Sequence, residues 1–297
     1  MSEARTRHSQ DQSASAATPA GDSTQSRSGR ITRRFQELSR ADKIGLVAYV
    51  TAGDPSLDAT EQIVTAASDA GADVIELGVP FSDPVADGPV IQRASDRALR
   101  AGTTLSGVIE LVRKLRSRTD VPLVLFSYFN PILQMGLETF AESAKSAGAD
   151  GVLATDLTVE ESDAYRAAMR AHGLDTIFLV APTSTDERLA RIGKASSGFL
   201  YLISRTGVTG TRDSLPEELP DLSRRTRRFT QLPLAVGFGI SQPQHVAALR
   251  GVADAAVVGS ALVSEIEKAG TAADAASAVA ARVRTLREGA RQVSRTE

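Results

Sequence analysis

Two carboxylates whose spacing could support acid–base chemistry stand in the segment VIELGVPFSDPVADGP, residues 74–89. Glu76 lies within an apolar run that has the composition of a β-strand, and Asp87 follows on a loop that contains several prolines. Because proline fixes the backbone, such a loop can hold a carboxylate in one position without a large loss of entropy on binding. The two residues therefore form a candidate acid–base pair.

The position of Glu76 in its strand predicts how it ionises. If side chains alternate, Glu76 and Val74 point to one side of the sheet, and Ile75 and Leu77 point to the other. Desolvation of an inward Glu76 would raise its pKa and suit it to general acid or base catalysis near neutral pH. We expect it to be flanked by Leu77, Val79, Phe81 and Tyr49. Taken singly, Glu76 could instead be half of a buried ion pair and Asp87 a turn residue, but the pair beside a phosphate site favours catalysis.

Three glycine-rich turns predict that phosphate site. They are SRTGVTGTR at 204–212, GFG at 237–239 and GSA at 259–261. Glycine lets the backbone approach a ligand closely, and Ser260 can open a helix as its N-cap. The free N–H groups and the dipole at such a helix start hold a phosphate dianion, and barrels often carry this site after strands 7 and 8. Plain turn chemistry is the alternative interpretation.

Eight short apolar runs could supply the strands that position these groups. They are continuous rather than alternating, which is typical of parallel strands buried on both faces. Their ranges are 44–50, 73–77, 122–128, 150–155, 175–180, 198–204, 233–239 and 254–259. Helical spacing of apolar residues lies between them, for example at 57–70 and 104–118.

The connections from helix to strand share one pattern, AGAD at 70–73 and at 147–150 and GVAD at 251–254. Glycine suits the left-handed position just past a helix, and the next apolar run follows at once. These units predict an α/β fold, a single (β/α)8 TIM barrel over residues 31–297, with an N-terminal extra helix at 31–43. An open doubly wound sheet is the alternative, but no G-x-G-x-x-G follows the first strand.

Residues 1–30 contain no Leu, Ile, Val or Phe, and they predict a disordered polar tail. An organelle transit peptide is the rival interpretation, which Glu3, Asp11 and Asp22 weaken because such peptides avoid acids. We predict a cytoplasmic protein. The net charge of −2 and the 4% aromatic content argue against nucleic acid as a partner, and no apolar run is long enough to span a membrane.

Metal-dependent chemistry is not expected from this composition. The chain has no cysteine, and its three histidines, His8, His172 and His245, lie far apart in the sequence. A histidine-rich metal site or a histidine-based triad is therefore improbable. Acid–base work is left to Asp, Glu, Lys or Tyr, which agrees with the candidate pair.

Six motifs occur in an order that resembles the tryptophan synthase alpha subunit family. They are YVTAGDP at 49–55, ELGVPFSDPVADGPVIQ at 76–92, YFNPI at 128–132, YLISRTGVTG at 201–210, GFGIS at 237–241 and VVGSALV at 257–263. The resemblance covers about residues 31–290 and implies a (β/α)8-barrel lyase of tryptophan biosynthesis. It implies retro-aldol cleavage of indole-3-glycerol phosphate to indole and glyceraldehyde 3-phosphate, with no metal or other cofactor. It also implies an α2β2 heterotetramer in which indole passes to a beta subunit that uses pyridoxal phosphate.

The resemblance carries site residues over to this chain by motif. Glu76 and Asp87 take the catalytic positions, and the loop at 205–217 is expected to close towards Asp87 through Thr209. The expected indole pocket includes Tyr49, Tyr128 and Tyr201. The expected phosphate contacts are Gly210, Phe238, Gly239, Gly259 and Ser260, and Asp83 is expected to face the beta subunit.

Two departures from the family pattern stand out. Thr158 replaces the usual proline near the expected subunit contact, and Tyr49 replaces a phenylalanine often seen at the indole pocket. Three other functions remain open on the sequence. The chain could be a stand-alone lyase that releases free indole, or another phosphate-binding barrel such as a sugar-phosphate isomerase. It could also be a non-catalytic barrel that acts only as a regulatory partner.

Overall fold

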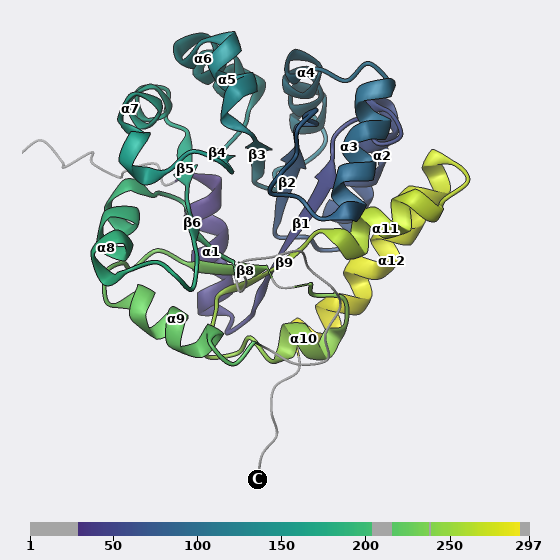
Figure 1. Cartoon of the computed structure of the whole chain (residues 1–297). Helices are drawn as coiled ribbons and strands as arrows, with labels where there is room; N and C mark the ends of the chain where they lie inside the picture. The colour runs from purple at the N-terminus through teal and green to yellow at the C-terminus, as the bar shows by residue number, and fades with distance from the viewer. Residues whose placement is uncertain (1–28, 204–215, 238, 292–297) are drawn as a thin grey trace, which may run out of the picture.

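A computed structural model describes residues 29–203, 216–237 and 239–291. Three of the predicted site residues, Thr209, Gly210 and Phe238, lie outside this range, as does the predicted tail up to residue 28. The described residues form parallel strands with helices ringed around them, as Figure 1 shows in a view along the strands. In the part of the chain that the structure describes, no helix is long and apolar enough to cross a membrane.

The strands form one parallel sheet with the order β5-β4-β3-β2-β1-β9-β8-β7-β6. Its two outermost strands, β5 and β6, are consecutive in the chain, with only Phe178 between them. The backbone N–H of Tyr201 donates to the carbonyl of Phe178 at 3.1 Å, so the sheet closes on itself there. The strands are β1 Gly45–Thr51, β2 Val74–Gly78, β3 Leu123–Ser127, β4 Gly151–Ala154, β5 Asp175–Ile177, β6 Leu179–Val180, β7 Leu200–Ile203, β8 Leu234–Gly237 and β9 Ala255–Val258.

The predicted (β/α)8 barrel is confirmed, with one difference. The run at 175–180 was predicted as a single strand, and the structure divides it into β5 and β6. The predicted helices at 57–70 and 104–118 appear as α2 and α4. The helical elements are α1 Arg30–Arg40, α2 Leu57–Asp69, α3 Pro89–Arg100, α4 Leu105–Arg116, α5 Phe129–Met135, α6 Leu137–Ala147, η1 Val159–Glu161, α7 Asp163–Ala171, α8 Asp186–Ala195, α9 Leu219–Arg227, α10 Pro243–Ala247, α11 Ser260–Lys268 and α12 Ala272–Arg291.

Alternation along the strands separates two apolar clusters. The outer cluster lies between the sheet and the helices and contains Ile75 and Leu77 of β2. The inner cluster fills the barrel and contains Val74 of the same strand. Its other strand residues come from all round the barrel and include Val47, Val124, Leu153, Ile177, Ala235 and Val257.

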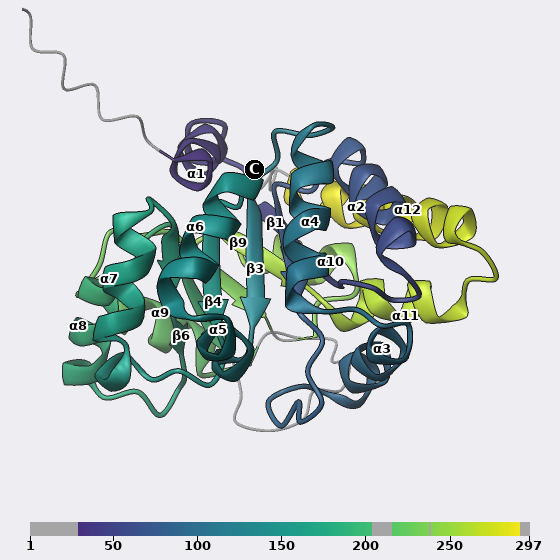
Figure 2. The ribbon, with the colours of Figure 1, turned by 90° about the horizontal axis from the view of Figure 1, so that it is seen from above.

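Helix α1 closes the end of the barrel at which the strands begin (Figure 2). The extra helix predicted at 31–43 is present as α1, and its residues Ile31, Phe35 and Leu38 are buried in the inner cluster. The ring centroids of Phe35 and Phe199 lie 5.6 Å apart. With this end filled by side chains, the opposite end remains for chemistry, where barrel active sites are found.

The repeated aspartates of the AGAD and GVAD motifs fix the strand register. The N–H of Asp73 donates to the carbonyl of Leu46 at 2.8 Å, and the N–H of Leu46 donates back to Asp73 Oδ2 at 2.7 Å. The same reciprocal pair joins Asp150 to Leu123 and Asp254 to Leu234. Each aspartate thus ties the start of its own strand to the start of a neighbour.

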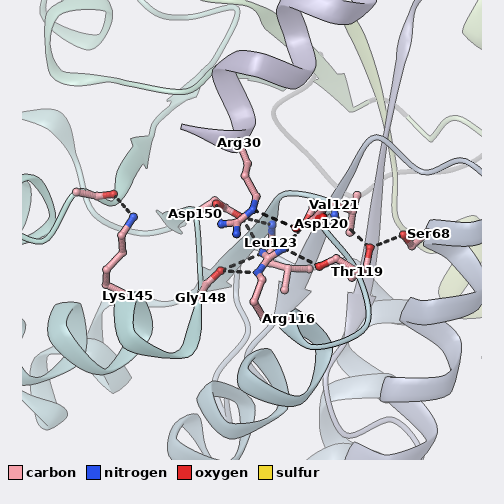
Figure 3. Close-up of polar contacts among 11 residues, drawn as sticks. Arg30, Ser68, Arg116, Thr119, Asp120, Val121, Leu123, Lys145, Gly148 and Asp150 are labelled. Carbon is pink, nitrogen blue, oxygen red and sulfur yellow. Dashed lines mark hydrogen bonds and ion pairs between the residues drawn. The ribbon is translucent and has the colours of Figure 1, made fainter. Parts of the chain in front are cut away.

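Arginines compensate the charge of these carboxylates, as Figure 3 shows for Asp150. Arg116 of α4 donates to Asp150 Oδ2 at 2.8 Å, and Arg30 of α1 donates to Asp150 Oδ1 at 3.1 Å. Arg34, also on α1, donates to Asp73. Helix α1 is therefore held to the barrel by ion pairs as well as by its apolar face.

Candidate active site

Glu76 lies on the inner face of β2, between Tyr49 of β1 and Val124 of β3 in the register of the sheet. Its side chain is completely buried, and neither carboxylate oxygen has a hydrogen-bond partner among the described residues. Burial raises the pKa of Glu76 to about 8. No Lys or Arg in the described part of the chain pairs with Glu76, so the alternative of a buried ion pair finds no support there.

The expected neighbours of Glu76 are only partly correct. Leu77 and Val79 belong to the outer cluster, because alternation turns them away from the barrel axis. Phe81 stacks on Tyr128, with 4.9 Å between the ring centroids. Tyr49 occupies the adjacent register position, as expected.

Two glycines make room for the tyrosines that surround Glu76. A Cβ atom on Gly78 would lie 2.1 Å from the hydroxyl of Tyr49, and one on Gly237 would lie 2.5 Å from the hydroxyl of Tyr201. Tyr49 is buried and Tyr201 is half-buried, and desolvation is the main cause that raises the pKa of each phenol. The charge of Glu76 raises the pKa of Tyr201 further, which agrees with the two side chains being neighbours.

Sequence reasoning did not assign this role to Gly78, although a glycine in an otherwise apolar strand is a known sign of close approach. Gly237 was assigned to a phosphate turn, and its contact with Tyr201 was not foreseen. Phe126 was also missed: its ring meets the ring of Tyr49 edge to face, with the centroids 5.3 Å apart.

Asp87 is held by Tyr128, which follows β3. The Tyr128 hydroxyl donates to Asp87 Oδ2 at 3.2 Å and accepts from the N–H of Ala86 at 2.9 Å. Partial burial raises the pKa of Asp87 to about 6, while the hydrogen bond from Tyr128 acts in the opposite direction. The side-chain amide of Gln92 donates to the carbonyl of Asp87 at 2.8 Å, so the loop is fixed on both sides of the carboxylate.

The predicted phosphate turns are described only in part. Gly239 has a φ of 82°, in the region that favours glycine. The role of Ser260 as an N-cap is wrong, because α11 begins at Ser260 and Gly259 is the capping residue. The carbonyl of Gly259 accepts the N–H groups of Leu262 and Val263. The N–H groups that precede them have no partner within the helix, so this helix start retains the donors that an anion needs.

Gly259 also lies beside Tyr49. A Cβ atom there would be 3.7 Å from Cδ1 of Tyr49 and 3.8 Å from Cδ1 of Ile91. The start of α11 is thus next to the inner face that carries Glu76. The described residues place a carboxylic acid, a second carboxylate and a helix N-terminus at one end of a (β/α)8 barrel. The class is that of (β/α)8 barrels, which hold their active sites at the carboxyl ends of the strands, and the groups gathered at that end are of the kind that acid–base chemistry uses.

Comparison with known proteins gives the family. The model of the "Tryptophan synthase alpha chain" family matches residues 35–293. The tryptophan synthase alpha chain of Solibacter usitatus is 56% identical over 239 residues, which are 80% of this chain and 90% of that protein. The corresponding chain of Geobacter sulfurreducens is 47% identical over 259 residues, 87% of this chain and 98% of that protein.

Solved structures agree. A Mycobacterium tuberculosis tryptophan synthase chain superposes with a TM-score of 0.83 at 35% identity, covering 89% of this chain and 99% of that one. Tryptophan synthase subunit alpha of Legionella pneumophila gives 0.81 at 38% identity, covering 88% and 98%. The chain belongs to the tryptophan synthase alpha chain family. It is a lyase of tryptophan biosynthesis that cleaves indole-3-glycerol phosphate.

Proposed function

We propose that Glu76 and Asp87 carry this cleavage, with Glu76 as the group that moves protons and Asp87 as the group that stabilises charge on the indole ring. The observation that carries the proposal is the fully buried carboxyl of Glu76, which has no hydrogen-bond partner among the residues that the structure describes. A pKa raised to about 8 keeps it protonated at neutral pH, so it can act first as an acid.

The reaction can be written with Glu76 alone handling both protons. Protonated Glu76 gives its proton to C3 of the indole ring, which converts the ring to an indolenine cation. The resulting carboxylate then removes the proton of the hydroxyl on the adjacent side-chain carbon. The bond between C3 and that carbon breaks, its electron pair returns to the ring, and indole and glyceraldehyde 3-phosphate leave. Glu76 ends protonated, as it began.

Asp87 acts on the other side of the ring in this proposal. Protonation of C3 places positive charge on the ring nitrogen, and a carboxylate that accepts its N–H stabilises that charge most in the transition state. The bond from Tyr128 and the restrained loop hold Asp87 in place before substrate arrives. Preorganisation of this kind needs no reorganisation during the reaction.

The rest of the substrate has assigned positions. The indole ring would lie among Tyr49, Tyr128 and Tyr201, and the phosphate would lie at Gly259 and Ser260. Gly239, together with Gly210 and Phe238 outside the described residues, completes the proposed phosphate contacts. Thr209, which also lies outside the described residues, is the residue proposed to close towards Asp87. Binding energy from the phosphate is remote from the breaking bond, so it can be used to orient the reacting atoms.

We further propose that the indole passes to a beta subunit in an α2β2 complex, in a cytoplasmic setting. Membership of the family and the similarity to chains of tryptophan synthase support this. Asp83 and Val85 lie exposed on the loop that carries Asp87, and Val85 is 87% exposed as a residue. A partner could therefore contact this loop directly. A stand-alone lyase and a non-catalytic regulatory partner remain the alternatives.

The test is indole release from indole-3-glycerol phosphate by the purified protein and its Glu76→Gln variant, each with and without added beta subunit. We expect the variant to lose at least about 10³-fold in kcat, because general acid and base steps both fail. Glu110→Gln, on the exposed face of α4, is the matched control and should keep full activity.

Each outcome separates the candidates. Cleavage that needs Glu76 and rises with the beta subunit supports the proposal, while fast cleavage that the partner does not change favours the stand-alone lyase. An active Glu76→Gln variant would remove Glu76 from the mechanism. Absence of cleavage in the unaltered protein under every condition, with the partner still responding to it, would favour the regulatory role.

A further inference from the structure

A chain of ion pairs joins three elements next to the proposed site. Arg97 of α3 donates through Nε and Nη2 to the two carboxylate oxygens of Asp54, each at 2.8 Å. Its third nitrogen, Nη1, donates to Glu267 of α11 at 2.9 Å. Arg93, one turn earlier on α3, donates to both oxygens of Glu267 at 2.8 Å.

The pair of Arg97 with Asp54 differs from an ordinary surface ion pair. The Asp54 side chain is only 1% exposed, and a buried carboxylate is costly unless it is paired. Two parallel N–H···O bonds also fix the plane of the guanidinium, which one lysine ammonium could not do. The pair of Arg93 with Glu267 is more exposed, and such a pair contributes little by itself.

The three elements lead to the two ends of the proposed substrate. Helix α3 begins at Pro89, two residues after Asp87, with Gly88 as its cap. Helix α11 begins at Ser260, in the proposed phosphate site. Asp54 lies in the loop after β1, the strand that carries Tyr49.

Apolar packing joins the same elements on the side facing the site. Tyr49, Ala94 of α3 and Val263 of α11 form one buried cluster, against which Val90 and Ile91 pack. Helices α3 and α11 lie side by side in Figure 2 and are in direct contact. The ion pairs therefore hold α3, α11 and the loop after β1 together on their outer side. On their inner side the same elements pack around Tyr49, which lines the proposed indole site.

We infer that Arg97 is a positioning residue that sets the separation between the start of α11 and Asp87. With Asp54 and Glu267 it matches the site to a substrate that has a phosphate at one end and an indole N–H at the other. The inference rests on the proposed function, because only there do these two places bind the two ends of one molecule. A misplacement of about 1 Å between such groups can lower a rate about 100-fold.

The test compares Arg97→Gln with Arg100→Gln, a control on the same helix that breaks an exposed ion pair with Asp96. Dissociation constants are measured for three probes: inorganic phosphate, indole, and indole-3-propyl phosphate, which carries both ends but has no hydroxyl to react. We expect Arg97→Gln to weaken the two-ended probe about tenfold and to leave each one-ended probe within about twofold, since each half-site stays intact. Its kcat/KM for indole-3-glycerol phosphate should fall on the order of 100-fold, and the control should match the unaltered protein.

A purely structural role gives a different pattern. Equal weakening of all three probes, or no weakening of the two-ended probe, overturns the inference. If Arg97→Gln does not fold, Glu267→Gln replaces it, because that variant keeps the buried pair with Asp54 and should give the same pattern with a smaller loss. The binding measurements need no turnover, so they stay readable even if the Glu76→Gln experiment rejects the proposed chemistry.

Discussion

At the scale of single residues, the protonation states of Glu76 and Asp87 determine the pH at which cleavage can run. The proposed reaction starts with Glu76 protonated and Asp87 ionised. Their pKa values, about 8 and about 6, place both residues in these states together only between those limits. Glutamate ordinarily has a slightly higher pKa than aspartate, and this site widens the gap: Glu76 is fully buried with no hydrogen-bond partner among the described residues, whereas Asp87 is only partly buried and accepts a hydrogen bond from Tyr128.

We therefore predict a bell-shaped dependence of kcat/KM on pH. Activity should fall below about pH 6 as Asp87 gains a proton, and above about pH 8 as Glu76 loses one. A Tyr128→Phe variant removes the bond that favours ionised Asp87, so its acidic limb should move to higher pH while the basic limb stays. Initial rates between pH 5 and pH 9.5 test this. An acidic limb that does not move would show that the hydrogen bond from Tyr128 does not influence the pKa of Asp87.

At the scale of elements, the aspartates at the strand starts should stabilise the protein without touching the reaction. Asp150 accepts from Arg30, Arg116 and the N–H of Leu123 (Figure 3). Asp150→Ala should lower the free energy of unfolding by about 3 kcal/mol, because it leaves a buried arginine and a strand N–H unpaired. Urea denaturation measures this, and kcat per folded molecule should not change.

Asp120→Ala is the control for that prediction. Asp120 also lies near Arg30, at 3.9 Å, but its side chain is 95% exposed. Its loss should change the free energy of unfolding by less than about 0.5 kcal/mol. Equal effects of the two variants would contradict the interpretation that burial and the reciprocal strand bond give Asp150 its importance.

The local sequence pattern predicted most of the strands and helices but not all of their boundaries. The inward side of Glu76 followed from alternation, and the strand positions followed from apolar runs. The break at Phe178 could not be read from DTIFLV, which is continuously apolar. The cap of α11 was wrong because residue type alone favoured Ser260, whereas the carbonyl of Gly259 already accepts the first helical bonds.

Single residues of the candidate site could be predicted from the sequence, whereas contacts between two residues that are distant in the sequence could not. Glu76 and Asp87 were predicted as a catalytic pair from their own sequence context and from the family resemblance, and the structure gives Glu76 a buried position on the inner face of β2. The space that Gly78 gives to Tyr49, and Gly237 to Tyr201, depends on strand register, which a single sequence does not specify. The same holds for the pair of Asp54 with Arg97, which lie 43 residues apart.

At the scale of the whole molecule, the residues at one end of the barrel stabilise the fold, and the residues at the other end form the proposed active site. Helix α1 lies at the end where the strands begin, and helix α11 starts at the end where they finish (Figure 2). The strand-start aspartates belong to the first end, and the loop after β2 that carries Asp87 belongs to the second. Barrels in general place catalytic groups at the carboxyl ends of strands and stability at the opposite end. Changes at the α1 end should therefore alter folding and leave turnover intact.

Phe35→Ala tests this division. Phe35 is buried in the inner cluster against Phe199, so its truncation should lower the free energy of unfolding by about 3–5 kcal/mol. Gln36→Ala, on the exposed face of α1, should be nearly neutral. Below the unfolding temperature both variants should keep the kcat of the unaltered protein. A large fall in kcat for folded Phe35→Ala would show that the ends are coupled.

The absence of a hydrogen-bond partner for Glu76 among the described residues also leads to an evolutionary expectation. An unpartnered carboxyl in a packed interior lowers stability, and the penalty grows as pH rises from the ordinary pKa of glutamate towards about 8. A glutamate at position 76 therefore costs the fold stability, and only a functional requirement would keep it there. In a lineage whose barrel lost the cleavage reaction, we expect selection for stability to replace this glutamate with an uncharged residue early, while the strand-start aspartates persist. The residue at this position is thus a sequence marker of whether a relative still cleaves its substrate.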